Sequence, residues 1–237
     1  MKINFSLPKS ILPFLKDKLD DYYLAGGTAL SMFYYQHRES FDLDFFTREF
    51  SKERVLKIID NLMKDSNWQA ELVAEQNKEN LIRVAVYLVK MEKNKECKID
   101  FVEDYVPLLN SLRRVDGINI LSLEDIYLRK IYAIAGHIST VNEIGQSIMS
   151  GGRQRAKDFY DLYYLSTTTM LLSDFVSHYC ENTVKEGVVH WYRTYDRMTI
   201  MDELLILPTK TKPDYRVIEN HFKKEIDRLL ETLIGGE

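Results

Sequence analysis

Two short groups of residues near the N-terminus have the composition of a catalytic site. Gly26 and Gly27 come shortly before Asp42 and Asp44, which are separated by one residue. Aspartates two positions apart in a strand point to the same face, and their charges repel unless a cation lies between them or one carboxylate is protonated. A glycine pair lets the backbone approach a phosphate closely. We therefore expect a site where a divalent metal ion and a nucleoside triphosphate meet.

A third carboxylate has the right surroundings to complete this site. Asp100 follows Lys98 and Ile99 in a second apolar–Asp–apolar pattern, so a neighbouring strand would place it beside Asp42 and Asp44. Three carboxylates are hard oxygen ligands that suit two Mg²⁺ ions. The alternatives are a solvated strand face for the first pair, and for Asp100 a partnership with Lys98 or a place at a strand end. Because aspartate is disfavoured in strands, we favour metal binding.

The residues between the glycines and the aspartates offer phosphate contacts. Thr28 opens an expected helix, whose N-terminus would present free N–H groups to an anion. Arg38 is a phosphate ligand or the partner of an acidic neighbour. Ser40 lies on the same strand face as Asp42, within reach of a phosphate or a metal-bound water. His37 has no second histidine or cysteine nearby, so it is expected to end the helix rather than to bind metal.

A second charged group lies in the later part of the chain. Lys130 is spaced to stack with Ile126 and Ile134 on one helix face, so it must either extend to solvent or reach a buried anion. Solvent is the commoner outcome, although a bound triphosphate would reverse the preference. Asp158 and Asp161 share a helix face at i, i+3. A solvated helix with local ion pairs is the alternative there, as it is for the cations Arg153, Arg155 and Lys157.

Hydrophobic periodicity predicts an α/β (α+β) half followed by a helical half. We place the first domain at residues 1–110 and the helical domain at 111–237, packed against it and completing the cleft. Ser51 and Ser122 are predicted helix N-caps, the latter with Asp125 at the third helical position. The predicted strands cover 22–25, 40–46, 81–89 and 96–102, with a polar turn at 93–95. The predicted helices cover 8–20, 28–36, 52–63, 122–135, 153–166, 171–183, 199–206 and 215–233.

Composition restricts the class of protein. The chain has 237 residues, 45% of them hydrophobic and 29% charged, which is typical of a globular protein with a sizeable core. A net charge of −4 argues against an indiscriminate nucleic-acid binder but leaves room for a local basic groove. Cys97 and Cys180 lack metal-ligand spacing and are expected to be free thiols in a reducing cytosol. We find neither a signal-peptide core nor a membrane-spanning run, so a cytoplasmic location is expected.

In these motifs the sequence resembles the AbiEii/AbiGii-type nucleotidyltransferase toxins, a branch of the polymerase-β-like nucleotidyltransferase superfamily. The matching pieces occur in the family's order across residues 22–165. The segment from His37 to Phe46 is the most specific of them. The other pieces are Gly26-Gly27-Thr28-Ala29-Leu30, Lys98-Ile99-Asp100, Leu123-Glu124-Asp125 through Lys130, and Arg155-Ala156-Lys157-Asp158-Phe159-Tyr160-Asp161-Leu162.

The resemblance implies a role for each matching residue. Asp42, Asp44 and Asp100 would bind two Mg²⁺ ions, and Asp100 would be the superfamily's third carboxylate. Lys130 would neutralise phosphate charge, and Asp158 would be a further essential acid that positions the acceptor or the Lys130 ammonium. The triphosphate would be held by Gly26 and Gly27, with Thr28, Arg38, Ser40 and Lys130 also binding nucleotide. The superfamily often has Gly-Ser where this chain has two glycines, so Thr28 would supply the hydroxyl.

The leading hypothesis is a Mg²⁺-dependent nucleotidyltransferase that moves an NMP from an NTP to an acceptor hydroxyl and releases pyrophosphate. The resemblance implies the toxin of a toxin–antitoxin or phage-defence system, with tRNA or a protein as acceptor and a cognate antitoxin as partner. One alternative is a catalytically silent module that binds a nucleotide or a protein. Another is a phosphotransferase that uses the same metals and releases ADP. The helices after about residue 170 carry no motif that assigns them a role.

Overall fold

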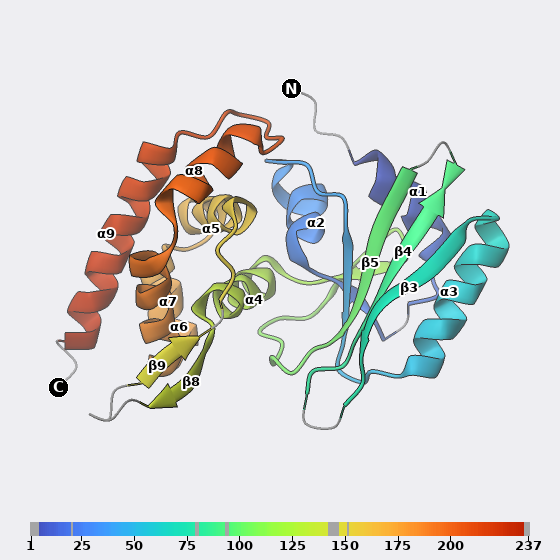
Figure 1. The fold of residues 1–237 in the computed structure, drawn as a ribbon, viewed down its shortest axis with the longest axis horizontal. Helices are drawn as coiled ribbons and strands as arrows, with labels where there is room; N and C mark the ends of the chain where they lie inside the picture. The colour runs from blue at the N-terminus through green and yellow to red at the C-terminus, as the bar shows by residue number, and fades with distance from the viewer. Residues whose placement is uncertain are drawn as a thin grey trace. The chain divides into compact units, whose positions relative to one another are not determined.

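The structure is a computed structural model that describes residues 5–19, 21–78, 81–92, 95–141, 147–150 and 152–234 (Figure 1). Contacts within the chain divide it into two compact units, residues 2–125 and 126–237. The division falls within helix α4 (Leu123–Ala135), later than the boundary at residue 110 expected from sequence. Strand pairing explains the difference, because β7 (Ile118–Ile120) pairs with β1 (Tyr23–Leu24) and so belongs to the first unit.

The first unit is built on one mixed sheet. Its described strands lie in the order β3-β4-β5-β2-β1-β7-β6. β2 runs parallel to β5 and β1 parallel to β7, while the other neighbours are antiparallel. The strands not yet given bounds are β2 (Leu43–Thr47), β3 (Gln69–Gln76), β4 (Val84–Met91), β5 (Lys95–Glu103) and β6 (Arg113–Val115).

Helices complete this unit. α1 (Ser6–Leu15) contacts both α3 (Lys52–Ser66) and β5, and α3 contacts β3. The sheet face that carries Leu43, Phe45, Ile99 and Phe101 is fully buried, as expected from the period-two alternation of strand side chains. α2 (Gly26–Leu30) contacts β2 and continues into a π-helical turn, η1 (Ser31–Tyr35). The predicted fold class, a helix-flanked mixed sheet followed by a helical region, is confirmed.

The second unit is mostly helical. Phe159, Phe175, Trp191 and Phe222 are buried in it, and α9 contacts α5, α6 and α7 (Figure 1). An antiparallel hairpin of β8 (His137–Val141) and β9 (Ser147–Ser150) lies between its first two helices along the chain. The helices after the hairpin are α5 (Ala156–Thr168), α6 (Leu172–Tyr179), α7 (Asn182–Thr194), α8 (Arg197–Ile206) and α9 (Tyr215–Ile234).

Several predicted boundaries were wrong. The expected helix at 28–36 begins at Gly26 instead, and the expected helix at 171–183 is two helices, α6 and α7. The expected strand at 40–46 begins only at Leu43, so Asp42 lies just before it, and Phe41 is 42% exposed rather than on the buried face. Strands β3, β6, β7, β8 and β9 were not predicted. Part of the polar turn expected at 93–95 lies outside the described residues.

Candidate functional site

Strand register brings two of the predicted aspartates together. β2 and β5 are neighbouring parallel strands in which Asp44 lies opposite Asp100. In both strands the flanking residues are buried on the other sheet face, so the two carboxylates share the opposite face. Asp42 precedes β2 by one residue, and its carbonyl oxygen accepts a hydrogen bond from the Thr28 hydroxyl. The sequence contains this alternation, but the partnership of β2 with β5 is a property of the fold.

The glycine turn packs directly against one of these carboxylates. Gly26 has a φ of +67°, and a Cβ atom there would lie 2.2 Å from Asp44 Oδ2. The backbone N–H of Ala25 donates to the Asp44 carbonyl oxygen at 2.8 Å. Only glycine satisfies both the left-handed backbone and the close approach. The expected proximity of the glycine pair to Asp44 is therefore present in the fold.

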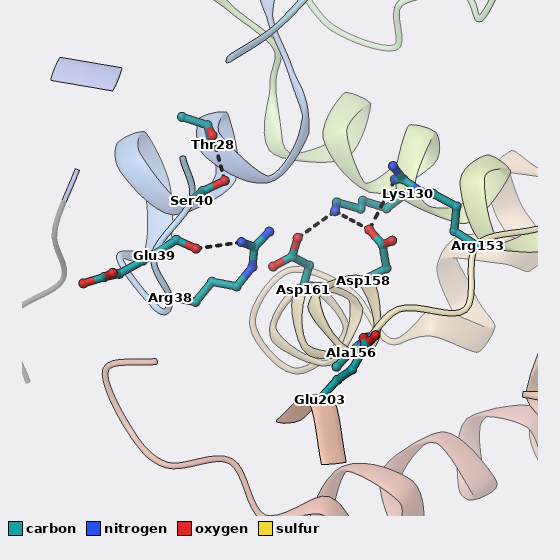
Figure 2. Close-up of polar contacts among 10 residues, drawn as sticks. All are labelled: Thr28, Arg38, Glu39, Ser40, Lys130, Arg153, Ala156, Asp158, Asp161 and Glu203. Atoms are coloured by element: carbon teal, nitrogen blue, oxygen red, sulfur yellow. Dashed lines mark hydrogen bonds and ion pairs between the residues drawn. The ribbon is translucent and has the colours of Figure 1, made fainter. Parts of the chain in front are cut away.

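The other residues of the first motif hold its loops together. Thr28 is fully buried, and its hydroxyl lies 2.7 Å from Ser40 Oγ (Figure 2). Arg38 is also buried, and its Nη1 donates to the Glu39 carbonyl oxygen at 2.8 Å. His37 is buried with Nδ1 3.4 Å from the Ser31 hydroxyl. Contacts of Thr28 and Arg38 with phosphate, which the sequence suggested, stay predictions.

A lysine takes part in the acidic face. Lys98 Nζ lies 2.6 Å from Asp100 Oδ2, which is the pairing considered as an alternative role for Asp100. The second oxygen, Asp100 Oδ1, is buried without a hydrogen-bond partner. Burial lowers the pKa of Lys98, but its hydrogen bond to Asp100 and the charges of Asp100, Asp42 and Asp44 outweigh this, so the pKa is raised. All three carboxylates therefore act on this one ammonium.

The thiol of Cys97 is affected by the negative charges of the same three carboxylates. Burial, followed by the charges of Asp42, Asp44 and Asp100, raises the pKa of Cys97 to about 12, which keeps the thiol protonated and unreactive. Within the described part of the chain, no three histidine, cysteine, aspartate or glutamate side chains are gathered closely enough to hold a metal ion. Asp44 and Asp100 thus share a sheet face, and the role of Asp42, Asp44 and Asp100 as metal ligands stays a prediction.

The second unit carries a buried ionic cluster. Lys130 on α4 is 5% exposed, and its Nζ lies 2.6 Å from Asp158 Oδ1 and 2.7 Å from Asp161 Oδ2 on α5 (Figure 2). Arg153 Nη2, on a half-exposed side chain, lies 3.2 Å from Asp158 Oδ1. Of the two outcomes considered for Lys130, the structure shows contact with buried anions, which are the two aspartates. The i, i+3 spacing places both aspartates on one helix face, and the resemblance implied that Asp158 could position the Lys130 ammonium; the contact of Asp161 with Lys130 was not predicted.

The charges of this cluster are mutually compensated. Burial by itself raises the pKa of Asp158, but the charges of Lys130 and Arg153 and the hydrogen bond from Lys130 outweigh it, so the pKa lies below its ordinary value. Asp158 Oδ2 is buried without a hydrogen-bond partner. Glu203 of α8, which sequence reasoning missed, accepts from the backbone N–H of Ala156 at 2.9 Å at the start of α5. No local sequence pattern around Glu203 predicts this contact with Ala156.

Known structures share this fold. The chain is similar to JHP933 from Helicobacter pylori, with 14% sequence identity and a TM-score of 0.56 over 98% of this chain and 97% of that one. It is also similar to a protein solved as a putative nucleotidyltransferase from H. pylori, with 15% identity and a TM-score of 0.56 over 97% and 96% of the two chains. These likenesses show that the chain has the same mixed α/β fold as those two proteins.

Sequence comparison identifies the family to which the chain belongs. Residues 13–236 match the family model described as the nucleotidyl transferase AbiEii toxin of type IV toxin–antitoxin systems, so the chain belongs to this family. It is also 29% identical over 225 residues to the uncharacterized protein aq_aa25 of Aquifex aeolicus (strain VF5), which covers 90% of each chain. The resemblance seen in the sequence motifs is confirmed. None of the described helices is long and apolar enough to cross a membrane.

Proposed function

We propose that this protein is a metal-dependent nucleotidyltransferase acting as the toxin of a toxin–antitoxin pair. The observation that carries the proposal is the pairing of Asp44 with Asp100 beside a turn in which Gly26 packs on the Asp44 carboxylate. Family membership supports the same class of reaction. A cognate antitoxin is the partner that the family implies.

The residues present suit a divalent cation. Asp44 and Asp100 offer carboxylate oxygens, the hard donors that Mg²⁺ prefers, and Asp100 Oδ1 is a buried acceptor with no hydrogen-bond partner. A buried acceptor of this kind costs free energy unless a donor or a cation meets it. We propose that Asp44 and Asp100, which are already paired, hold Mg²⁺. Asp42 is not gathered with them in the described structure, and we propose that it joins them, with room for two ions, when the metal and a triphosphate bind. Bound Mg²⁺ would neutralise phosphate charge and favour departure of pyrophosphate.

The chain's own residues would position the reactants. Gly26 and Gly27 open helix α2, where free N–H groups favour an anion. In the proposed reaction the acceptor oxygen forms a bond to the α-phosphorus of the NTP, and the bond from that phosphorus to the bridging oxygen breaks. Pyrophosphate leaves, and the proton of the acceptor hydroxyl passes to water. Lys130 and Asp158 of the second unit are buried against each other, so we propose them as positioning residues of the site rather than as groups that contact the reacting atoms.

Label transfer tests this proposal. Each NTP, labelled at the α-phosphate, is incubated with the protein and with total tRNA, total RNA or a protein extract in the presence of Mg²⁺. We expect transfer by the wild type and by Asp60→Asn, a control that changes an exposed aspartate of α3. Asp44→Asn should lose about a thousandfold or more, which corresponds to roughly 4 kcal/mol of transition-state stabilisation. Equal transfer by Asp44→Asn and wild type would refute the proposal.

The ion pair between Lys98 and Asp100 favours a second candidate, a silent module that binds a nucleotide or a partner protein. A cation already lies against one proposed ligand at 2.6 Å, which a protein with no need of a metal would retain. Calorimetry with each NTP distinguishes the two functions. Binding that is unchanged by Mg²⁺, without pyrophosphate release, supports the module, whereas binding that requires Mg²⁺ supports the enzyme.

A further inference from the structure

Lys98 lies where its charge opposes that of a bound metal ion. Its ammonium contacts Asp100 Oδ2 at 2.6 Å, and it interacts electrostatically with Asp42 and Asp44 as well. A single positive charge therefore faces the same three carboxylates that we assign to the metal. Like charges a few ångströms apart repel, so the ammonium and a divalent ion compete for Asp100.

The pair of Lys98 and Asp100 does little to hold the fold together. Both residues belong to β5, two positions apart on one face, so the ion pair links no separate elements. The Lys98 side chain is 38% exposed, and ion pairs with such access to water contribute little to stability. Lys90 provides a contrast, because it pairs with Glu71 across β4 and β3 at 2.8 Å and so connects two strands.

Exposure also gives Lys98 a way to move. Asp100 is 17% exposed and fixed within the sheet, whereas the lysine has a long flexible stem whose head can turn into water. Lys130 has no such freedom, since its side chain is only 5% exposed and lies between two carboxylates. Of these two lysines, Lys98 is therefore the one whose ammonium can leave its aspartate without remaining buried.

We propose that Lys98 is a built-in countercation that neutralises the acidic face in the metal-free protein and must leave Asp100 when a divalent ion binds. Lys98 then sets the metal affinity of the site without being a metal ligand. The inference rests on the proposed function, because it assumes that Asp44 and Asp100 receive the metal. Under this inference the Lys98–Asp100 ion pair belongs to a site that binds metal, whereas in the silent module the same ion pair would belong to a site that needs no metal.

Metal titration of matched variants tests the inference. Mn²⁺, which electron paramagnetic resonance detects directly, is titrated into wild type, Lys98→Met, Lys98→Arg and the control Lys90→Met. Lys98→Met keeps the length of the stem and removes the charge, so the dissociation constant for Mn²⁺ should fall about tenfold, as removal of a nearby like charge predicts. Lys98→Arg and Lys90→Met should bind Mn²⁺ as the wild type does, and Asp100→Asn should cancel the gain.

Thermal unfolding supplies a second measurement that does not depend on activity. Without metal, Lys98→Met should melt slightly below the wild type, because its carboxylates have lost their countercation. With Mn²⁺ its melting temperature should rise more than that of the wild type. Equal Mn²⁺ affinity in wild type and Lys98→Met would overturn the inference and leave the proposed function standing. Absence of Mn²⁺ binding from every variant would overturn both.

Discussion

Each unit of the chain sets a lysine against aspartate carboxylates, but the two surroundings differ. On the sheet, Lys98 is 38% exposed and contacts Asp100, whose second oxygen has no hydrogen-bond partner. In the helical unit, Lys130 is 5% exposed and joins Asp158 on one side and Asp161 on the other. In the first arrangement the ammonium has access to solvent, whereas in the second it is enclosed between two buried carboxylates.

This difference in burial gives the two groups of lysine and aspartate different roles. A buried ion pair is costly to break, because the remaining charge has neither water nor a partner. A partly exposed pair is screened and loses little when one partner leaves. We therefore expect the acidic sheet face to change its ligands during function, and the Lys130 cluster to keep a fixed geometry.

The largest expected effect is that of Lys130→Met on stability. Removing the ammonium takes from two buried carboxylates the cation that both contact, although Arg153 still lies beside Asp158, and should lower the free energy of unfolding by about 3–5 kcal/mol. Lys98→Met should cost at most about 1 kcal/mol, because the Lys98 side chain is 38% exposed and water already screens this ion pair. Urea denaturation measures both. Fluorescence of Trp191 reports the helical unit for Lys130→Met in a Trp68→Phe background, and fluorescence of Trp68 reports the sheet unit for Lys98→Met in a Trp191→Phe background.

Lys157→Met is the matched control, because Lys157 lies on the same helix as Asp158 but is exposed. It should change the free energy of unfolding by no more than about 0.5 kcal/mol. If Lys130→Met and Lys157→Met lost the same stability, the contrast between a fixed and an exchangeable cluster would be wrong.

The second-largest effect comes from alanine substitutions at two glycines, which separate the cost of backbone strain from an effect on the site. Gly26→Ala and Gly117→Ala each place a side chain at a positive φ, +67° and +78°, at an expected cost of about 1–3 kcal/mol. At Gly26 the new Cβ also meets the Asp44 carboxylate, whereas at Gly117 it meets the side chains of Lys16 and Asp17. Only Gly26→Ala should weaken Mn²⁺ binding and nucleotidyl transfer. Comparable Mn²⁺ affinities in the two variants would remove Gly26 from the site.

The smallest effect is the acid dependence of the helical unit. Because the pKa of Asp158 is lowered in the folded protein, its ion pair stabilises fully above the ordinary aspartate pKa. That contribution is lost as the pH falls through the lowered folded value. Unfolding measured by urea between neutral and acidic pH should therefore show a steeper acid-side loss in the wild type than in Asp158→Asn. Parallel pH profiles would show that Asp158 adds nothing to this dependence.

Local signals in the sequence predicted much of the fold. Ser51 was expected to cap α3, and its hydroxyl accepts from the Arg54 N–H at 3.3 Å. Ser122 was expected to cap α4, and it accepts from the Asp125 N–H at 3.0 Å. These contacts lie within one turn, so nearby residues suffice to specify them. Strand β3 was missed, because it has no buried residue and therefore no period-two alternation to detect.

The amino-acid sequence by itself determined the types and local spacing of the reactive groups: a glycine pair, two aspartates separated by one residue, and a third aspartate in a similar strand. It also contained the i, i+3 spacing of Asp158 and Asp161. Only the tertiary structure decided which groups meet. The parallel pairing of β2 with β5 set Asp44 beside Asp100, and the packing of α5 on α4 directed Lys130 to buried carboxylates. Such contacts join segments far apart in the chain, so no local pattern encodes them.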